Sequence, residues 1–282
     1  VQVVASIKPI HSLVAAVMEG AGQPTLLVGG SATPHTFQLR PSDAEMLQGA
    51  QLVFWVGPEL ETFLEKPLEI LTGKSTTVSL IDIKGLQILA VREGDGFAAH
   101  DDHSAEGGEH KQERDAHIWL DPSNAQFIIS AIRDELIKSD SENAKLYAAN
   151  TERLLAQLNG LDDEITLATS GFKGSKFITF HDAFQYFERR YGLSSEGTIL
   201  LNSESPPGAA KIREIHKQIA SGQIKCVFTE PQFDNKLVRV VIEGTNAKIG
   251  ELDPIGATLE PGPELYENLI RNIATSLKSC LD

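Results

Sequence analysis

Short apolar runs rich in β-branched residues alternate with helix-like segments, and this alternation constrains the fold more than any other feature. Four runs lie in each half of the chain, at residues 3–7, 25–28, 52–56 and 77–81, and at residues 176–180, 198–201, 226–229 and 248–252. Strands that alternate with helices predict parallel sheets covered by helices. The sequence therefore predicts an α/β protein of two similar lobes, each a mostly parallel β-sheet flanked by helices.

A long amphipathic stretch separates the two halves. Its large apolar side chains step at helical spacing and form one stripe, made of Tyr147, Leu154, Leu158, Leu161 and Ile165. Residues 140–170 are therefore predicted to form one rigid connecting helix, roughly 40 Å long at 1.5 Å per residue. The lobes then comprise residues 1–139 and 171–282, and the absence of a Gly/Ser hinge predicts small tilts between them.

Three histidines stand in separate short motifs: His35 in TPHTFQLRPSD, His117 in AHIWLDPSNA and His181 in FITFHDAFQYF. His181, Glu230 and Asp253 each follow the end of a predicted second-half strand, while His35 and His117 lie in loops after first-half strands. Ligands of such sheets bind beyond the carboxyl ends of the strands. We therefore expect these residues to face one interlobe cleft. A single histidine is more often an ordinary hydrogen-bonded or surface imidazole, so the prediction depends on their shared placement.

The types of these residues predict the metal. Three imidazoles plus one oxygen, here from Asp253, form a typical four-coordinate zinc environment. Manganese favours carboxylate and other oxygen ligands, whereas copper and nickel compete for imidazole sites. The sequence therefore favours Zn²⁺, with a receptor for manganese or another divalent metal as an alternative.

The start of a helix is predicted directly after the His35 loop. In PSDAE, Ser42 has the position of an N-cap and Glu45 follows three residues later, which is the capping-box pattern. A helix that begins there would hold the His35 loop in place.

Six motifs, in order, resemble those of periplasmic zinc-binding receptors, the solute-binding components of high-affinity zinc ABC importers (metal-receptor cluster A-I). They are PHTFQLRPSD, LVFWVGPELE, HIWLDP, FHDAFQYFE, CVFTEPQF and LDPIG. The resemblance covers nearly the whole chain and implies two α/β lobes, a long rigid connecting helix and a metal between the lobes. It implies a non-enzymatic, monomeric receptor that binds zinc through His35, His117 and His181 and delivers it to an inner-membrane ABC permease.

The fourth ligand is where this chain departs from several relatives. They carry Glu directly before the first histidine, whereas this chain has Pro34. The resemblance points instead to Asp253, whose counterpart is a ligand in related zinc and manganese receptors, with a bound water as the alternative. Asp253 is also suited to a turn before Pro254. Glu230 is expected to accept a proton from a ligand imidazole and fix its tautomer, or else to be a buried carboxylate bonded to backbone.

The chain has two cysteines, Cys226 and Cys280. The family resemblance implies that they form a disulfide, and two reduced buried cysteines are the alternative. A disulfide closing a loop of roughly 55 residues would contribute about 4 kcal/mol and would require an oxidising compartment such as the Gram-negative periplasm. The chain begins almost directly in a strand, which fits a mature protein whose signal peptide has been removed.

Residues 92–115 are rich in charge and glycine and are predicted to form a mobile loop. His100, His103 and His110 lie there among acidic side chains, a composition that binds metals loosely. The resembling family often carries a longer His-rich loop at this place, thought to capture or sense zinc. The alternative is a solvated acidic loop with incidental imidazoles.

Charge and missing motifs exclude other classes of function. The 39 acidic and 25 basic side chains give a net charge of −14, which repels nucleic acid and anionic membranes and attracts cations. No apolar run approaches the roughly 20 residues of a membrane span, so no membrane insertion is expected. Because HExxH and GxSxG are absent, a zinc hydrolase is the weaker alternative. A metal-binding adhesin is another, disfavoured because no N-terminal Cys is present for lipid attachment.

Overall fold

A computed structural model describes residues 1–71, 73, 75–92, 113–200 and 207–282. The predicted His- and acid-rich loop, with His100, His103 and His110, falls almost entirely outside these residues. No helix in the described part of the chain is long and apolar enough to cross a membrane.

The first lobe is built on a four-stranded parallel sheet. Its order is β2-β1-β3-β4, and Val3 of β1 pairs with Leu52 of β3. The strands are β1 Val3–Ile7, β2 Thr25–Val28, β3 Leu52–Trp55 and β4 Thr76–Ser79, and the helices between them are α1 Lys8–Val17, α2 Pro41–Gly49 and α3 Thr62–Leu71. This alternation confirms the α/β pattern predicted for the first half.

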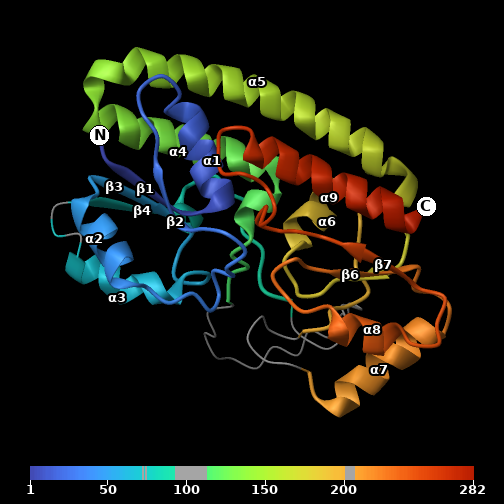
Figure 1. Ribbon diagram of the computed structural model, residues 1–282. Helices are drawn as coiled ribbons and strands as arrows, with labels where there is room; N and C mark the ends of the chain where they lie inside the picture. The colour runs from blue at the N-terminus through green and yellow to red at the C-terminus, as the bar shows by residue number, and fades with distance from the viewer. Residues whose placement is uncertain (72, 74, 93–112, 201–206) are drawn as a thin grey trace, which may run out of the picture.

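The second lobe has a smaller parallel sheet of order β5-β6-β7. Its strands are β5 Phe177–Ile178, β6 Cys226–Thr229 and β7 Lys248–Glu251, and its helices are α6 Gln185–Tyr191, α7 Ala209–Ala220, α8 Lys236–Ile242 and α9 Leu265–Leu281. In Figure 1, α9 lies on one side of this sheet, and α7 and α8 lie on the other.

The prediction of a strand at residues 198–201 was wrong for residues 198–200, which the structure describes. Only an isolated parallel bridge joins Thr179 to Thr198, although the backbone N–H of Leu200 donates to Phe180 O at 2.8 Å. The Thr198 hydroxyl donates to Leu200 O at 2.8 Å. Such a local side-chain contact competes with regular strand geometry.

The long connecting helix is confirmed. Helix α4 (Pro122–Ser139) leads through a short 3₁₀ turn (Ser141–Asn143) into α5 (Ala144–Thr169), whose 26 residues span about 39 Å. The predicted apolar stripe of α5 is buried, and the helix runs along α1 and α4 at one end and α9 at the other (Figure 1). Helix α5 therefore braces both lobes.

The two lobes also share apolar packing and polar contacts. One apolar cluster joins the first sheet to α4, α5 and α9 and reaches Phe228, and a smaller cluster lies between β6, α7 and α8. Lys8 of α1 donates to the carbonyls of Gly256, Ala257 and Leu259 at 3.1, 2.7 and 2.9 Å. These contacts favour small tilts over wide opening, while the boundaries at residues 139 and 171 stay a prediction.

The predicted N-cap of α2, Ser42, was wrong by two residues. Pro41 takes the first helical position, so Arg40 is the N-cap and Asp43 occupies the third position. The Asp43 carboxylate accepts the Arg40 backbone N–H at 2.8 Å, and Ser42 and Glu45 are exposed. The helix still begins directly after the His35 loop, as expected.

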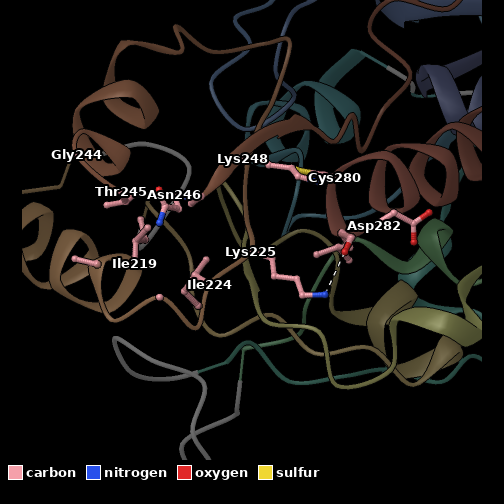
Figure 2. Close-up of a pocket in the computed structure, with 13 residues that line it drawn as sticks. Ile219, Ile224, Lys225, Gly244, Thr245, Asn246, Lys248, Cys280 and Asp282 are labelled. Carbon is pink, nitrogen blue, oxygen red and sulfur yellow. Dashed lines mark hydrogen bonds between the residues drawn. The ribbon is translucent and has the colours of Figure 1, made fainter.

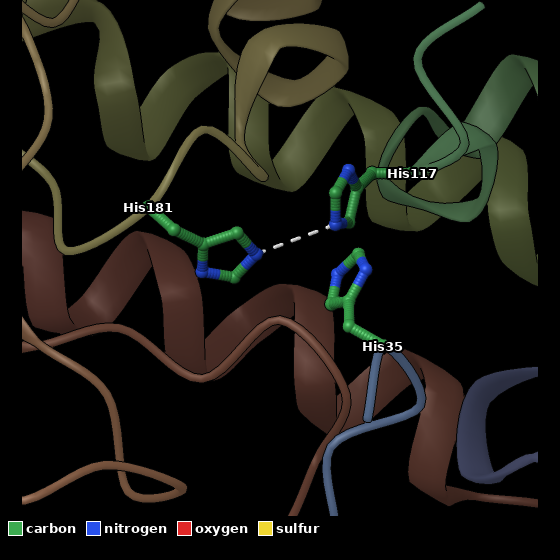
Figure 3. Close-up of side chains that lie close together, drawn as sticks. All are labelled: His35, His117 and His181. Carbon is green, nitrogen blue, oxygen red and sulfur yellow. Dashed lines mark hydrogen bonds between the residues drawn. The ribbon is translucent and has the colours of Figure 1, made fainter. Parts of the chain in front are cut away.

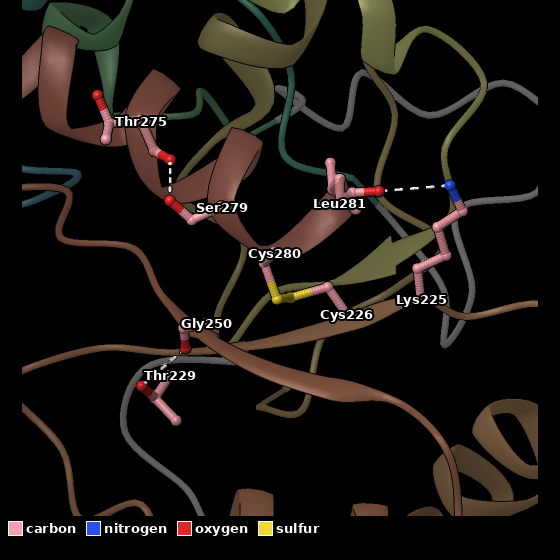
Figure 4. Close-up of a disulfide and its surroundings, with 8 residues drawn as sticks. All are labelled: Lys225, Cys226, Thr229, Gly250, Thr275, Ser279, Cys280 and Leu281. Carbon is pink, nitrogen blue, oxygen red and sulfur yellow. Dashed lines mark hydrogen bonds between the residues drawn. A yellow bond between two sulfur atoms is a disulfide. The ribbon is translucent and has the colours of Figure 1, made fainter.

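Cys226 and Cys280 form the disulfide, with Cα atoms 5.9 Å apart. It ties the first residue of β6 to α9 (Figure 4). Gly250 of β7 permits this packing, because a Cβ there would lie 2.5 Å from the Phe228 ring and 3.1 Å from Cys280 Sγ. The disulfide therefore secures the second sheet to the helix that also contacts the first lobe.

Candidate metal centre

The fold gathers the three predicted histidines at one point between the lobes (Figure 3). His35 lies in the loop between β2 and α2, His117 directly precedes the 3₁₀ turn Ile118–Leu120, and His181 follows β5. One ring nitrogen from each residue lies within 4.8 Å of the other two. Sequence reasoning therefore located the cluster correctly, and its occupation by zinc stays a prediction.

The two most buried histidines have the spacing of metal ligands. Nε2 of His117 lies 3.4 Å from Nε2 of His181. Two nitrogens on a tetrahedral zinc, each about 2.05 Å from the ion, are separated by about 3.3 Å. The separation of these two nitrogens is therefore that of two ligands on one zinc ion.

A buried carboxylate orients each of these rings. Nδ1 of His181 lies 2.6 Å from Glu230 Oε1, and Nδ1 of His117 lies 2.8 Å from Asp115 Oδ1. A carboxylate can only accept a hydrogen bond, so Nδ1 of each ring keeps its proton and donates it, and the lone pair of the neutral ring is on Nε2, which faces the centre. The contact expected of Glu230 is present, and its service to a bound metal stays a prediction.

Asp115 was missed by sequence reasoning. It is 4 % exposed and also accepts the backbone N–H of His117 at 3.0 Å. The available signal was its position in DAHIW, two residues before a ligand candidate, where an Asx-type bond to the following backbone is common. Asp115 supplies to His117 the same kind of contact that Glu230 supplies to His181.

Burial and neighbouring charges shift the pKa values of two ligand candidates in opposite directions. Burial first, and then the imidazoles of His117 and His181, lower the pKa of His35 to about 2. Burial is the largest single influence on His181 and disfavours its charged form, but the carboxylates of Glu230, Asp182 and Asp115 together outweigh burial and raise the pKa of His181. His35 is therefore neutral and able to bind a cation. His181 keeps a second ring proton to higher pH than an ordinary imidazole does, and that proton must leave before a cation can bind.

Asp253 is outside the group of three imidazoles. Its Oδ1 accepts the side-chain amide of Gln232 at 3.0 Å and the backbone N–H groups of Ile255 and Gly256 at 3.1 and 2.9 Å. This is the turn role that the sequence left open. That Asp253 is the fourth ligand stays a prediction. These three hydrogen bonds to its Oδ1 do not favour it.

The cavity at the histidines is small. It is lined by the three imidazoles together with Trp119, Gln232 and Phe233, and it leaves about 10 Å³ for the centre of a water-sized sphere. A single water needs roughly that much room. The cavity has room for about one species of the size of a water molecule or a metal ion and is too small for an organic substrate.

A larger hollow of about 350 Å³ lies elsewhere, near the end of α9 (Figure 2). Lys225, Lys248 and Asp282 line it together with apolar residues such as Ile219 and Ile224. Lys225 Nζ donates to Leu281 O at 3.3 Å. No cluster of metal-ligating side chains is found there among the described residues, so the histidine centre is the candidate functional site.

The chain matches the family described as zinc-uptake complex component A, periplasmic (ZnuA), over residues 3–280. The chain belongs to this family. The high-affinity zinc uptake system protein ZnuA of Brucella abortus (strain 2308) is 45% identical, over 99% of this chain and 91% of that protein.

Two solved structures show the same fold. One, described as a crystal structure of ZnuA, is 22% identical and has a TM-score of 0.85, covering 100% of this chain and 99% of its own. The periplasmic zinc binding protein TroA from Treponema pallidum is 22% identical and has a TM-score of 0.83, covering 99% of this chain and 98% of its own. Membership of the ZnuA family places this chain among uptake receptors rather than enzymes.

Proposed function

We propose that this protein is a high-affinity periplasmic zinc receptor. It captures Zn²⁺ between its lobes at His35, His117 and His181 and delivers the ion to an inner-membrane ABC permease. The observation that carries the proposal is the 3.4 Å separation of two Nε2 atoms whose rings are each fixed by a buried carboxylate. The name of the Brucella relative, a zinc uptake protein, supports the same function.

The ligand set favours zinc over manganese. All three ligands are imidazoles, which suit zinc, whereas manganese prefers oxygen ligands and stands low in the affinity order for nitrogen sites. We expect the protein to bind zinc far more tightly than manganese. Copper and nickel are expected to compete in vitro, because affinity alone does not exclude them.

A water molecule is proposed as the fourth ligand. Oδ1 of Asp253 is already bonded to three donors, and the cavity has room for about one water. Gln232 lines the same cavity, and its Oε1 is buried without a donor among the described residues. Since its amide nitrogen donates to Asp253, this oxygen is available to accept a hydrogen bond from a zinc-bound water.

Release to the permease is proposed to involve local change and protons. Because α5 and the shared apolar cluster tie the lobes together, we expect loop rearrangement and small tilts. Ligand imidazoles must be neutral, so zinc affinity falls as pH falls. The free receptor is proposed to be a monomer that has lost its signal peptide, with the tract containing His100, His103 and His110 as an accessory zinc-capturing segment.

A zinc competition titration against a chromophoric chelator tests the function. The intact protein is compared with a variant lacking residues 97–113 and with His35→Ala. We expect one tight zinc equivalent in the intact chain and in the deletion variant, and loss of that tight site in His35→Ala. Retention in His35→Ala together with loss in the deletion variant would move the site to the deleted tract and refute the proposal.

A further inference from the structure

An arginine of the first lobe reaches into the second lobe directly beside a ligand candidate. The Arg92 guanidinium donates through Nε to both carboxylate oxygens of Asp182, at 3.0 and 2.9 Å, and through Nη1 to Glu188 Oε2 at 2.8 Å. Asp182 immediately follows His181 in the chain. The side chains of Arg92 and Asp182 are each 17% exposed and that of Glu188 is 5% exposed, so removing one partner would leave a poorly solvated charge.

Glu188 is itself held in place. Its carboxylate accepts the backbone N–H of Ser195 at 3.2 Å and the Ser195 hydroxyl at 2.9 Å. A planar guanidinium that bonds two fixed carboxylates has little freedom to move. Arg92 therefore anchors the segment that carries His181 to the first lobe.

A second link runs in the opposite direction, from α6 of the second lobe to the His117 side. The Gln185 amide donates to Asp115 Oδ2 at 3.1 Å and to Ala90 O at 3.0 Å. Asp115 uses its other oxygen to hold the His117 ring. The Tyr186 hydroxyl donates to Asp115 O at 2.8 Å. Asp115, which orients a first-lobe histidine, is thus held by second-lobe side chains at both its carboxylate and its backbone carbonyl.

His35 has no such support. No hydrogen bond to its ring is found in the described part of the chain, and its ring contacts those of His117 and His181. Two of the three histidines are therefore connected by a network of polar contacts across the lobes, called the brace below. The third, His35, lies on a loop outside this network. The brace is defined here as Arg92, Asp182, Glu188, Gln185 and Asp115.

We propose that Arg92 and Gln185 are positioning residues that hold His117 and His181 at ligand spacing before the metal arrives. The hydrogen bonds found for these two side chains in the described part of the chain go to the carboxylates of Asp182, Glu188 and Asp115 and to a backbone carbonyl, so both act on the rings indirectly. The inference rests on the proposed zinc-binding function. If so, zinc affinity depends on contacts between the lobes. His35 then adds a third ligand to a pair, His117 and His181, that is already in place.

The test compares two brace variants with matched controls. Gln185→Met keeps the side-chain length but removes the amide, and Arg92→Met removes the guanidinium. We expect each to weaken zinc binding roughly 10- to 100-fold, as is typical when a group that orients a ligand is lost, and Arg92→Lys to be intermediate. Arg190→Met, which breaks the α6 contact of Arg190 Nε with Asp162 at 2.9 Å, and Gln218→Met on α7 should bind zinc like the intact protein.

Two readouts distinguish the proposed positioning role from a merely structural one. Arg92→Met and Arg190→Met are both expected to lower the melting temperature, but only Arg92→Met should change the zinc Kd measured far below either melting temperature. A crystal structure of metal-free Gln185→Met should show the His117 and His181 Nε2 atoms farther apart than 3.4 Å. Unchanged Kd values in both brace variants, or an unchanged separation, would overturn the inference. Failure of the intact protein to bind zinc would instead refute the proposed function.

Discussion

Replacing Glu230 by glutamine isolates the charge that acts on His181. Glu230 is 2% exposed, and its Oε1 lies 2.6 Å from Nδ1 of His181. Glutamine keeps the size and an oxygen acceptor but removes the negative charge. The substitution therefore tests whether the carboxylate strengthens His181 as a metal ligand.

Two effects of opposite sign follow from this substitution. Loss of a group that orients and polarises a ligand imidazole weakens metal binding by about 10- to 100-fold, or about 1.4 to 2.8 kcal/mol. The same carboxylate raises the pKa of His181 against the effect of burial, so its loss lets burial lower that pKa. A proton then competes with zinc only at lower pH. We expect weaker binding at pH 8 and a fall in affinity that begins at lower pH than in the intact protein.

Chelator competition from pH 5.5 to 8.5 measures both effects. Below the pKa of a ligand imidazole, affinity falls by up to about tenfold per pH unit for each proton displaced. Glu196→Gln is the control, because Glu196 is 36% exposed and pairs with Lys176 at 3.5 Å, away from the histidines. Unchanged affinity at pH 8 together with an unchanged pH profile in Glu230→Gln would refute the reasoning.

Three further predictions concern other parts of the molecule. Asp253→Asn keeps the turn acceptor Oδ1, so zinc affinity in the chelator competition titration should change less than threefold if water is the fourth ligand. A loss of affinity of 100-fold or more would identify Asp253 as a ligand. Cys226→Ala with Cys280→Ala should lower the free energy of unfolding by about 4 kcal/mol in urea denaturation while one tight zinc equivalent remains, and an unchanged free energy would contradict this. Burial raises the pKa of Glu61 to about 7. Between about pH 4.5 and 7 the folded state therefore binds more protons than the unfolded state. The free energy of unfolding falls as pH rises through that window, by about 3 kcal/mol from this group. Glu61→Gln should flatten that dependence in urea denaturation, and an unaltered slope would contradict the assignment.

Periodicity predicted the elements whose burial follows local pattern. The α5 stripe from Tyr147 to Ile165 was readable because each of its large apolar residues faces the shared core. Residues 198–201 carried an equally strand-like composition, yet a local Thr198 bond competes with the ladder there. The α2 cap was misplaced because the helix begins at Pro41, which makes Arg40 the N-cap, two residues before Ser42.

The site was predictable only in part. The strand-end rule located His181 and Glu230 because both follow parallel strands of one sheet. The role of Asp115 depends on the angle of a backbone turn, and those of Arg92 and Gln185 depend on how two lobes meet. Sequence spacing carries no information on such contacts between distant segments, so these residues emerge only from the structure.

The central claim is that one zinc ion binds between the lobes at three imidazoles. An anomalous difference map, measured at the zinc absorption edge on crystals of the zinc-loaded protein, tests it most directly. The account predicts one strong peak, about 2.0 to 2.1 Å from Nε2 of His117, Nε2 of His181 and one ring nitrogen of His35. A strong peak elsewhere, with none at these three rings, would contradict it.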